Sequence, residues 1–378
     1  MPVFYVVFLL LAALVAWLSY FFLRRAVRAF GVDTKRRRNK LILWGGATAI
    51  GICSLVLQSF FVPFLLHFFM FAALFQIGNF IFRKIARKHY ENGFSVWKKI
   101  YALSLLPILL TAATLVYGYV NVHTVVATHY TVQTEKDIRE EGYRAVFLSD
   151  VHYGVSLDRE EMQAVCDEIT KQKPDFVILG GDIIDHETGK EKTREVFEIL
   201  GTIESTYGTY FVFGNHDRPM RGMPSEFADQ YGEEELIALI EACGIRVLKD
   251  TIADIGEDYE IALMGREDRS MSERDSVLGF TSSTFVDVFR LMVDHRPCDY
   301  QENGDHGTDL VLSGHTHGGQ FFPLNYVMTF FGNDAVYGRT EIDENTVAIV
   351  SSGLACWGYP YKTAAPAEYL VIDIVPEG

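Results

Sequence analysis

Long runs of apolar residues fill the first third of the chain. The run 3–23 has no charged residue, and 41–82 is a second uncharged run of 42 residues. An α-helix rises about 1.5 Å per residue and a hydrocarbon core is about 30 Å thick, so the second run is long enough for two crossings. With a further apolar run after residue 100, the pattern predicts four transmembrane helices, at about 3–23, 41–60, 62–82 and 101–120.

Other interpretations of these runs are weaker. A cleavable signal peptide usually has a basic residue before its apolar core, and no Lys or Arg precedes Val3. Buried helices of a globular protein rarely remain uncharged over such lengths. We expect the turn of the 41–82 hairpin near Gln58–Pro63. Pro107 would lie inside the last span, where neighbouring helices can satisfy the carbonyl group that it frees.

After residue 122 the pattern changes to short apolar runs that alternate with amphipathic stretches. Residues 123–142 are expected to be a polar linker that contains a short strand. Four later runs are apolar and end in polar residues: RAVFLSD, PDFVILGGD, TYFVFGNHD and DLVLSGHTH. Amphipathic stretches at 159–171 and 192–203 separate the first three. Such strands and helices predict an α/β domain over 143–378, with its chemistry at the carboxyl ends of the strands.

Charge divides the chain at the same place. Residues 1–122 carry 14 Lys and Arg against two Asp and Glu, a formal charge of +12, and the remainder carries 20 against 47, a charge of −27. The acidic part would repel a phosphate backbone, and the basic residues lie beside apolar runs. We therefore expect the lipid bilayer as a partner, and no nucleic acid.

The cations also predict a topology. They fill two loops, 24–40 and 83–99, whereas the turn near residue 60 has none. The positive-inside rule places both loops in the cytoplasm, so the chain is expected to be a multi-pass cell-membrane protein with its catalytic domain on the outer face. The opposite orientation remains an alternative, because a large domain can override local charge bias.

Each of the four polar strand ends carries Asp, Asn or His. Asp, Asn and Gly at a single strand end would be ordinary turn formers, but turn chemistry does not require histidine. Residues two apart in an extended segment project to one side, so Asp150 can approach a site together with His152, and His315 together with His317. Carboxylate, imidazole and amide ligands suit Mn²⁺, Fe²⁺, Zn²⁺ or Co²⁺. The sequence therefore predicts a divalent metal site.

In this order, the motifs Asp-x-His, Gly-Gly-Asp, Gly-Asn-His-Asp and Gly-His-Thr-His resemble the calcineurin-like metallophosphoesterase superfamily, over about residues 143–375. The string GHTHGGQ together with the apolar helices is similar to its membrane-anchored YkuE-type branch, which includes the transmembrane proteins with a metallophosphoesterase domain. The resemblance implies a four-layer α/β/β/α metallophosphoesterase sandwich preceded by a four-helix transmembrane region. It also implies two divalent metal ions, of Mn, Fe, Zn or Co, that activate water for in-line attack on phosphorus.

The resemblance further implies a role for each residue. Seven residues would bind metal, with one carboxylate shared between the two ions. They are Asp150, His152 and His317 for one metal, Asn215, His295 and His315 for the other, and Asp182 between them. Two residues are expected to be catalytic: His216 over the leaving group, and Asp217 in support of its surroundings.

Two positions depart from the family pattern. His295 stands in Asp-His-Arg-Pro, where the family usually has His-Asp-Pro, and His306 in the loop 303–309 is the alternative ligand. Lys362 stands where Arg is more usual. This exchange removes the bidentate fork with which an arginine would clamp a phosphate.

The sequence thus predicts a membrane-anchored, two-metal phosphohydrolase that acts on a lipid-linked or cell-envelope phosphoester. The alternatives are a UDP-diacylglucosamine-type pyrophosphate hydrolase of lipid A synthesis and a catalytically silent metal-binding sensor. The complete ligand set disfavours the sensor. A transporter with an accessory phosphatase is disfavoured because the predicted spans contain no Asp, Glu, Lys or Arg.

Overall fold

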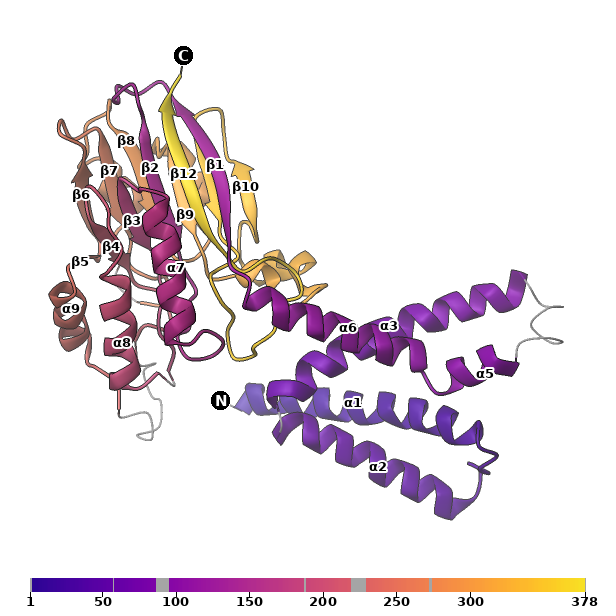
Figure 1. Ribbon diagram of the computed structural model, residues 1–378. Coiled ribbons are helices and arrows are strands. Elements are labelled where there is room, and N and C mark those ends of the chain that lie inside the picture. The colour runs from indigo at the N-terminus through magenta and orange to yellow at the C-terminus, as the bar shows by residue number, and fades with distance from the viewer. Residues whose placement is uncertain are drawn as a thin grey trace. The chain divides into compact units, whose positions relative to one another are not determined.

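The computed structural model describes residues 2–56, 58–85, 95–186, 188–218, 229–271 and 274–377, and the chain divides into two compact units (Figure 1). The first unit is Met1–Tyr117 and the second is Gly118–Gly378. This boundary comes earlier than the charge pattern suggests, because the end of the last apolar helix belongs to the second unit. The side chain of Asn121 donates hydrogen bonds of 2.8 Å to the carbonyl oxygens of Lys362 and Ala365.

The described part of the first unit is helical. Its helices are α1 (Pro2–Arg28), α2 (Arg37–Val56), α3 (Gln58–Ile85), α5 (Ser95–Ala102) and α6 (Leu105–Val122), which continues into the second unit. Among the described residues, three helical segments are long and apolar enough to cross a membrane: Leu9–Arg28, Phe61–Ile85 and Leu105–Val122. The described part of α2 is not among them, since its first residues include Arg37, Arg38 and Lys40. Three candidate spans are therefore found where four were expected.

Two details of these helices differ from the expectation. Gln58–Pro63, the expected turn, is the start of α3, and Pro63 lies inside this helix, where it has no backbone N–H to donate. The expected span 101–120 is interrupted between α5 and α6. Pro107 consequently lies in the first turn of α6, where a backbone N–H has no partner within the helix.

Two six-stranded sheets form the second unit (Figure 1). The first sheet has the order β1 (Val126–Thr134), β12 (Glu368–Pro376), β2 (Tyr143–Leu148), β3 (Phe176–Leu179), β4 (Thr209–Val212) and β5 (Ile245–Leu248). The second has the order β10 (Gly338–Glu341), β11 (Val347–Val350), β9 (Leu310–Ser313), β8 (Phe289–Val293), β7 (Ile261–Gly265) and β6 (Thr251–Ile255). Strands β2 to β5 pair in parallel, as do β7, β8, β9 and β11, so the carboxyl ends of each set lie at one edge of its sheet.

The segment 123–142, expected to be a linker with a short strand, contributes β1 to the first sheet. This strand pairs in parallel with β12, from Val126 opposite Glu368 to Thr134 opposite Pro376. The partners come from distant parts of the chain, so no local pattern reveals the pairing. The polar segment is therefore an integral edge of the sheet.

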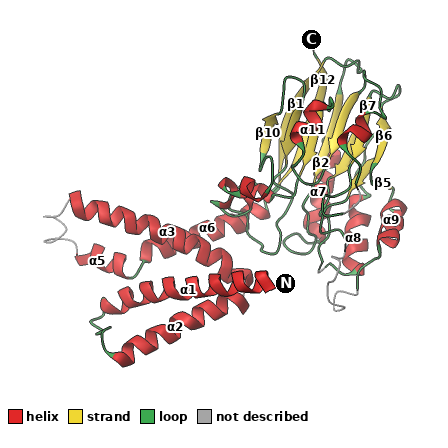
Figure 2. Cartoon of the chain, turned by 180° about the vertical axis from the view of Figure 1, so that it is seen from behind, coloured by secondary structure: helices red, strands yellow, loops and turns green. Residues whose placement is uncertain are grey.

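Apolar side chains gather between the sheets and on both outer faces. Phe147, Phe176 and Leu291 belong to the cluster between the sheets. The outer faces are covered by α7 (Arg159–Lys171), α8 (Lys190–Leu200) and α9 (Glu233–Ala242) on the first sheet, and by α10 (Val277–Thr281) and α11 (Tyr300–Asp305) on the second (Figure 2). Helix α7 begins where the pattern predicts, because Asp158 and Glu161 form a capping box. The predicted mixed α/β architecture is confirmed.

Candidate metal centre

Several of the predicted site residues have an unusual backbone conformation. Five of them have a positive φ, in the left-handed region that costs a side-chain-bearing residue about 1–3 kcal/mol unless its surroundings enforce it. They are Asp150 (54°), His152 (40°), Asp182 (54°), His315 (68°) and His317 (51°). All five follow the carboxyl ends of β2, β3 or β9. Strained positions gathered at one edge are typical of a functional site.

Asp150, His152 and His317 form one group of possible metal ligands, with all three ligand atoms within 4.8 Å of one another. The Nε2 atoms of the two histidines face each other at 3.2 Å, and His317 Nε2 lies 3.5 Å from Asp150 Oδ1. Two nitrogen ligands about 2.0–2.1 Å from one ion would be separated by about 3.0–3.4 Å. The group therefore has the spacing of ligands around a single ion.

Asp182, His295 and His315 form a second group within the same limit. His295 Nε2 lies 3.0 Å from Asp182 Oδ2, and the Nδ1–H group of His295 donates to the carbonyl oxygen of Gly180 at 2.8 Å. That hydrogen bond leaves Nε2 available as a ligand. Asp182 Oδ2 is also 3.8 Å from His152 Nε2, so this carboxylate lies between the two groups.

Several buried polar atoms in this region have no hydrogen-bond partner among the described residues. They include Asn215 Oδ1 and His317 Nδ1. Buried polar atoms in native proteins usually have a partner, because an unsatisfied one costs about 1–3 kcal/mol. Oxygen and nitrogen lone pairs of this kind are the donor set of a borderline divalent ion, and the residues present fit such an ion.

The charges of these groups depend on one another. Burial lowers the pKa of His295, but attraction to Asp182 outweighs this effect and raises the pKa to about 10. Burial alone would raise the pKa of Asp182, but His295 holds it well below its ordinary value. Burial raises the pKa of Asp150 and lowers that of His315 to about 3. The buried carboxyl groups thus stay ionised only when positive charge lies nearby. Divalent cations supply such charge.

Asp185 was not predicted from the sequence, yet it contacts two site histidines. Its Oδ1 lies 3.3 Å from His216 Nδ1 and its Oδ2 lies 3.3 Å from His152 Nδ1. Burial lowers the pKa of His216, but contact with Asp185 outweighs it and raises this pKa. The only signal in the sequence was a second Asp three residues after Asp182, which is also common in ordinary turns. The neighbouring His186, also missed, has its ring 4.6 Å from that of His216.

Asp217 supports the site through the backbone. Its carboxylate accepts hydrogen bonds from the N–H groups of Asp182 (2.8 Å), Ile183 (2.8 Å), Ile184 (3.2 Å) and Gly214 (2.7 Å). It thereby fastens the loop after β3 to the loop after β4. All four donors are backbone N–H groups. Asp217 therefore holds the loop that carries His216 in place.

His295 and Lys362, the two departures from the family pattern, have different surroundings. His306 caps the end of α11 and belongs to neither ligand group, whereas His295 belongs to the second. Lys362 is fully buried, and its ammonium donates to the carbonyl oxygens of Ser352, Gly353 (2.8 Å) and Ala355 (3.3 Å). Burial lowers the pKa of Lys362 to about 8. The Lys362 ammonium is therefore bound by the backbone of one loop. The Ala355 N–H of this loop donates to the carbonyl oxygen of Asp150.

A third acidic group near the site already has cations of its own. Asp294, Cys298 and Asp299 have the spacing of metal ligands. Arg266 donates to Asp294 at 3.3 Å and to Asp299 at 2.9 Å, and Arg274 donates to the same two carboxylates. Guanidinium groups thus occupy the position that an ion would need.

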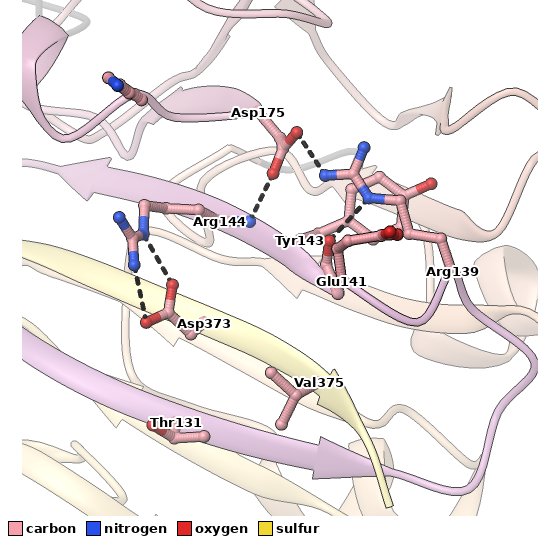
Figure 3. Close-up of a pocket in the computed structure, with 10 residues that line it drawn as sticks. Thr131, Arg139, Glu141, Tyr143, Arg144, Asp175, Asp373 and Val375 are labelled. Atoms are coloured by element: carbon pink, nitrogen blue, oxygen red, sulfur yellow. Dashed lines mark hydrogen bonds and ion pairs between the residues drawn. The ribbon is translucent and has the colours of Figure 1, made fainter.

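A shallow pocket lies at the opposite end of the sheets (Figure 3). Its two arginines pair with its two aspartates: Arg139 donates to Asp175 at 2.5 Å, and Arg144 donates to Asp373 at 2.7 and 3.1 Å. Asp175 also accepts from the backbone N–H of Arg144 at 2.7 Å. These contacts satisfy both arginines and both aspartates within the protein, and the pocket lies far from the two ligand groups, so it is not our candidate site.

The chain is similar to several known proteins. Residues 143–319 match the family described as calcineurin-like phosphoesterase. The transmembrane protein with metallophosphoesterase domain of Danio rerio is 28% identical over 328 residues, which cover 82% of this chain and 70% of the relative. The uncharacterized metallophosphoesterase YkuE of Bacillus subtilis (strain 168) is 27% identical over 274 residues, 68% of this chain and 89% of YkuE.

A further relative matches over less of its length. An uncharacterized metallophosphoesterase of Helicobacter pylori (strain ATCC 700392 / 26695) is 26% identical over 242 residues, 62% of this chain and 60% of the relative. The chain thus spans less than two thirds of that protein. The second unit, with its two ligand groups, contains a calcineurin-like metallophosphoesterase domain, the domain of a metal-dependent phosphoesterase family that works with two metal ions.

Proposed function

We propose that the protein is a membrane-anchored phosphohydrolase with two divalent metal ions in its active site. The observation that carries the proposal is the pair of buried ligand groups with Asp182 between them. One ion would be held by Asp150, His152 and His317, the other by Asn215, His295 and His315, with Asp182 shared. When bound, two such ions lower the pKa of water and neutralise charge on a phosphoryl group.

The residues of the chain would position the substrate's leaving group. Asp185 contacts Nδ1 of His216, and this contact leaves Nε2 to donate a proton to the departing oxygen. Asp217 keeps the loop of His216 attached to the loop of Asp182. His216 is thus proposed as the general acid, with Asp185 and Asp217 as positioning residues.

The decisive experiment removes and restores the metal. Purified protein is treated with chelator until its metal content is negligible, and is then supplied separately with Mn²⁺, Zn²⁺, Fe²⁺ or Co²⁺. Hydrolysis should disappear with the metal and return with at least one ion. Activity that survives exhaustive chelation would refute the two-metal mechanism, and restored metal binding without hydrolysis would favour the sensor.

The membrane anchor suggests the class of substrate that we propose. We infer that α2 is a fourth span beside the three candidate helices, as part of the predicted four-helix region. The cations at 24–40 and 83–99 support a topology with these loops in the cytoplasm and the catalytic domain on the outer face. A hydrolase held there would encounter lipid-linked or envelope phosphoesters, so lipid phosphates are the first substrates to test against nucleotide sugars.

The orientation is testable by labelling. In a variant without native cysteines, a cysteine at Glu135 should react with an impermeant reagent on intact cells or spheroplasts, and one at Asn39 should not. The reverse pattern would place the domain in the cytoplasm. In that case a nucleotide-sugar lipid of the UDP-diacylglucosamine type becomes the leading substrate.

A further inference from the structure

The chain enters the catalytic domain at the same edge as the candidate metal centre. β1 follows the end of α6, and its first residue, Val126, pairs with Glu368 at the start of β12 (Figure 1). β12 is antiparallel to β2, so its start lies beside the end of β2, where Leu370 pairs with Phe147. The end of α6 is therefore close to the edge at which β2 ends and Asp150 follows.

The last turns of α6 are attached to a loop at this edge. The carbonyl oxygen of Gly118 accepts a hydrogen bond of 3.1 Å from the N–H of Lys362, and Asn121 binds the carbonyl oxygens of Lys362 and Ala365. A Cβ atom at Gly118 would lie 2.6 Å from the Cγ2 of Thr363, so this packing is close. If α6 crosses a bilayer, this loop must lie where the helix leaves it.

Two neighbouring loops expose an unusual number of aromatic side chains. Gln320 joins them, because its side chain donates to the carbonyl oxygen of Trp357 at 3.1 Å and accepts from the Trp357 N–H at 3.1 Å. The N–H of Phe322 donates to Thr363 Oγ1 at 3.0 Å. The exposed rings, which we call the aromatic surface, are Phe322 (40%), Tyr326 (71%), Phe330 (83%), Phe331 (75%) and Trp357 (47%).

Charge distinguishes the aromatic surface from the rest of its domain. Residues 318–333 include no Asp, Glu, Lys or Arg, although the chain after residue 122 carries 67 charged residues. Single exposed apolar residues are normal, but five aromatic rings on two joined loops form a patch that needs a partner. Phe, Tyr and Trp beside the end of a membrane helix are typical of contact with the interfacial zone of a bilayer.

We propose that the aromatic surface inserts into the interfacial zone of the bilayer that α6 crosses, to a depth of about 5–10 Å. This inference rests on the proposed function, and it adds that the metal centre opens toward the membrane surface. Trp357 connects the two, because its ring lies 5.6 Å from that of His216. A phosphoester with a lipid alcohol can then reach His216 with its leaving oxygen while its chain remains in the bilayer.

The depth of the surface can be measured on the full chain in vesicles. The five native cysteines are replaced by serine, and a nitroxide is attached to a cysteine at Phe330, in vesicles of phosphatidylcholine and phosphatidylglycerol. Phe285 is the matched control, since it is 82% exposed and precedes the amino end of β8. Oxygen, which concentrates in lipid, should relax the label at Phe330 more than a water-soluble nickel complex does, and the reverse should hold at Phe285.

Two results would overturn the proposal. Equal accessibility of both labels to the nickel complex would mean that the aromatic surface faces water. Dipolar broadening at Phe330 that disappears on dilution with unlabelled protein would mean that a second copy of the chain covers it. Neither result depends on hydrolysis, so failure of this inference and failure of the proposed function are distinguishable.

Kinetics supply a second test. The double change Phe330→Ser and Phe331→Ser should lower kcat/KM for a vesicle-borne lipid phosphoester by about tenfold, because two rings no longer enter the interface. It should leave kcat/KM for soluble nitrophenyl phosphate unchanged, and Phe285→Ser should change neither value. An unchanged rate on vesicles, or an equal loss on both substrates, contradicts the proposal.

Discussion

The two ends of the sheets in the second unit both contain polar residues, but these residues differ in whether they have partners within the protein. At the carboxyl ends of β4 and β9, buried atoms such as Asn215 Oδ1 and His317 Nδ1 have no hydrogen-bond partner among the described residues. At the other end, Arg139 pairs with Asp175 and Arg144 with Asp373 (Figure 3). The first end leaves buried lone pairs without a partner, whereas the second pairs its arginines and aspartates with each other.

Backbone conformation differs in degree, because Lys173 is the one described non-glycine residue of the far pocket with a positive φ (52°). Asp150, Asp182 and His317, all at the first end, have positive φ values. This conformation is unfavourable for a residue with a Cβ atom, so the surrounding contacts must stabilise it. Charge alone therefore does not mark a site. Burial without a partner distinguishes the candidate metal centre from a surface ion-pair cluster, and backbone strain is concentrated there.

The largest effect is expected for Asp182→Asn. The neutral amide cannot offset the charge of two ions, and several kcal/mol of lost stabilisation correspond to a fall in kcat/KM of at least about 10⁴-fold. Metal content, measured on the same sample, should also fall. The matched control is Asp373→Asn at the opposite end, which should keep nearly full activity. Similar losses from both substitutions would invalidate the distinction between the two ends.

His216→Ala should have a large effect that depends on the substrate. A general acid matters in proportion to how strongly the leaving group needs a proton, so an alkyl or lipid phosphoester should lose on the order of 10²–10⁴-fold in kcat/KM. A nitrophenyl phosphoester should lose much less, because its leaving group departs readily as an anion. His317→Ala is the control: it should damage both substrates about equally and reduce bound metal.

An equal loss on both substrates in His216→Ala would give this residue a different role. Its imidazolium would then stabilise the phosphoryl oxygens, and the proton would come from elsewhere. Asp185→Asn separates the two roles further. It removes the carboxylate that contacts His216 Nδ1, so it should reproduce part of the substrate dependence of His216→Ala.

Asp217→Asn should affect stability more than chemistry. The carboxylate is buried and accepts four backbone N–H groups, and hydrogen bonds to a charged group contribute about 1.5–3 kcal/mol. We expect the free energy of unfolding to fall by about that amount, as measured by denaturant titration of the reconstituted chain. A stable variant that has lost all activity would instead indicate a direct role in catalysis.

Local pattern predicted the parts of the fold that depend on local interactions. The strands that end at Asp150, Asp182 and Asn215 were visible because apolar runs stop at polar residues. The amphipathic stretch 159–171 matches α7 to the residue, and a capping box of Asp158 and Glu161 fixes the start of this helix. The mixed α/β sheets followed from the alternation of these elements.

Long-range contacts account for what the sequence did not reveal. β1 pairs with β12, which is far from it in the sequence. The local pattern therefore could not show that this segment belongs to the sheet, and the segment was interpreted as a linker. Asp185 was missed because its partners, His152 and His216, come from two other loops. The aromatic surface was missed because its rings come from two loops that are far apart in the sequence and are joined by hydrogen bonds between Gln320 and Trp357. Each of these features depends on how distant segments meet.

The smallest effect is expected at the end of the sheets that needs no ligand. The Arg144 and Asp373 side chains are 40% and 34% exposed, so water screens their ion pair strongly. A double-mutant cycle with Arg144→Ala and Asp373→Ala should give a coupling of about 0.2–1 kcal/mol in the free energy of unfolding, and it should fall with added salt. The same variants should retain metal content and kcat/KM within a factor of about two, because no contact of this pair reaches the strained loops. A loss of bound metal in either variant would show that the two ends are coupled through the sheet, and the far pocket would then belong to the site.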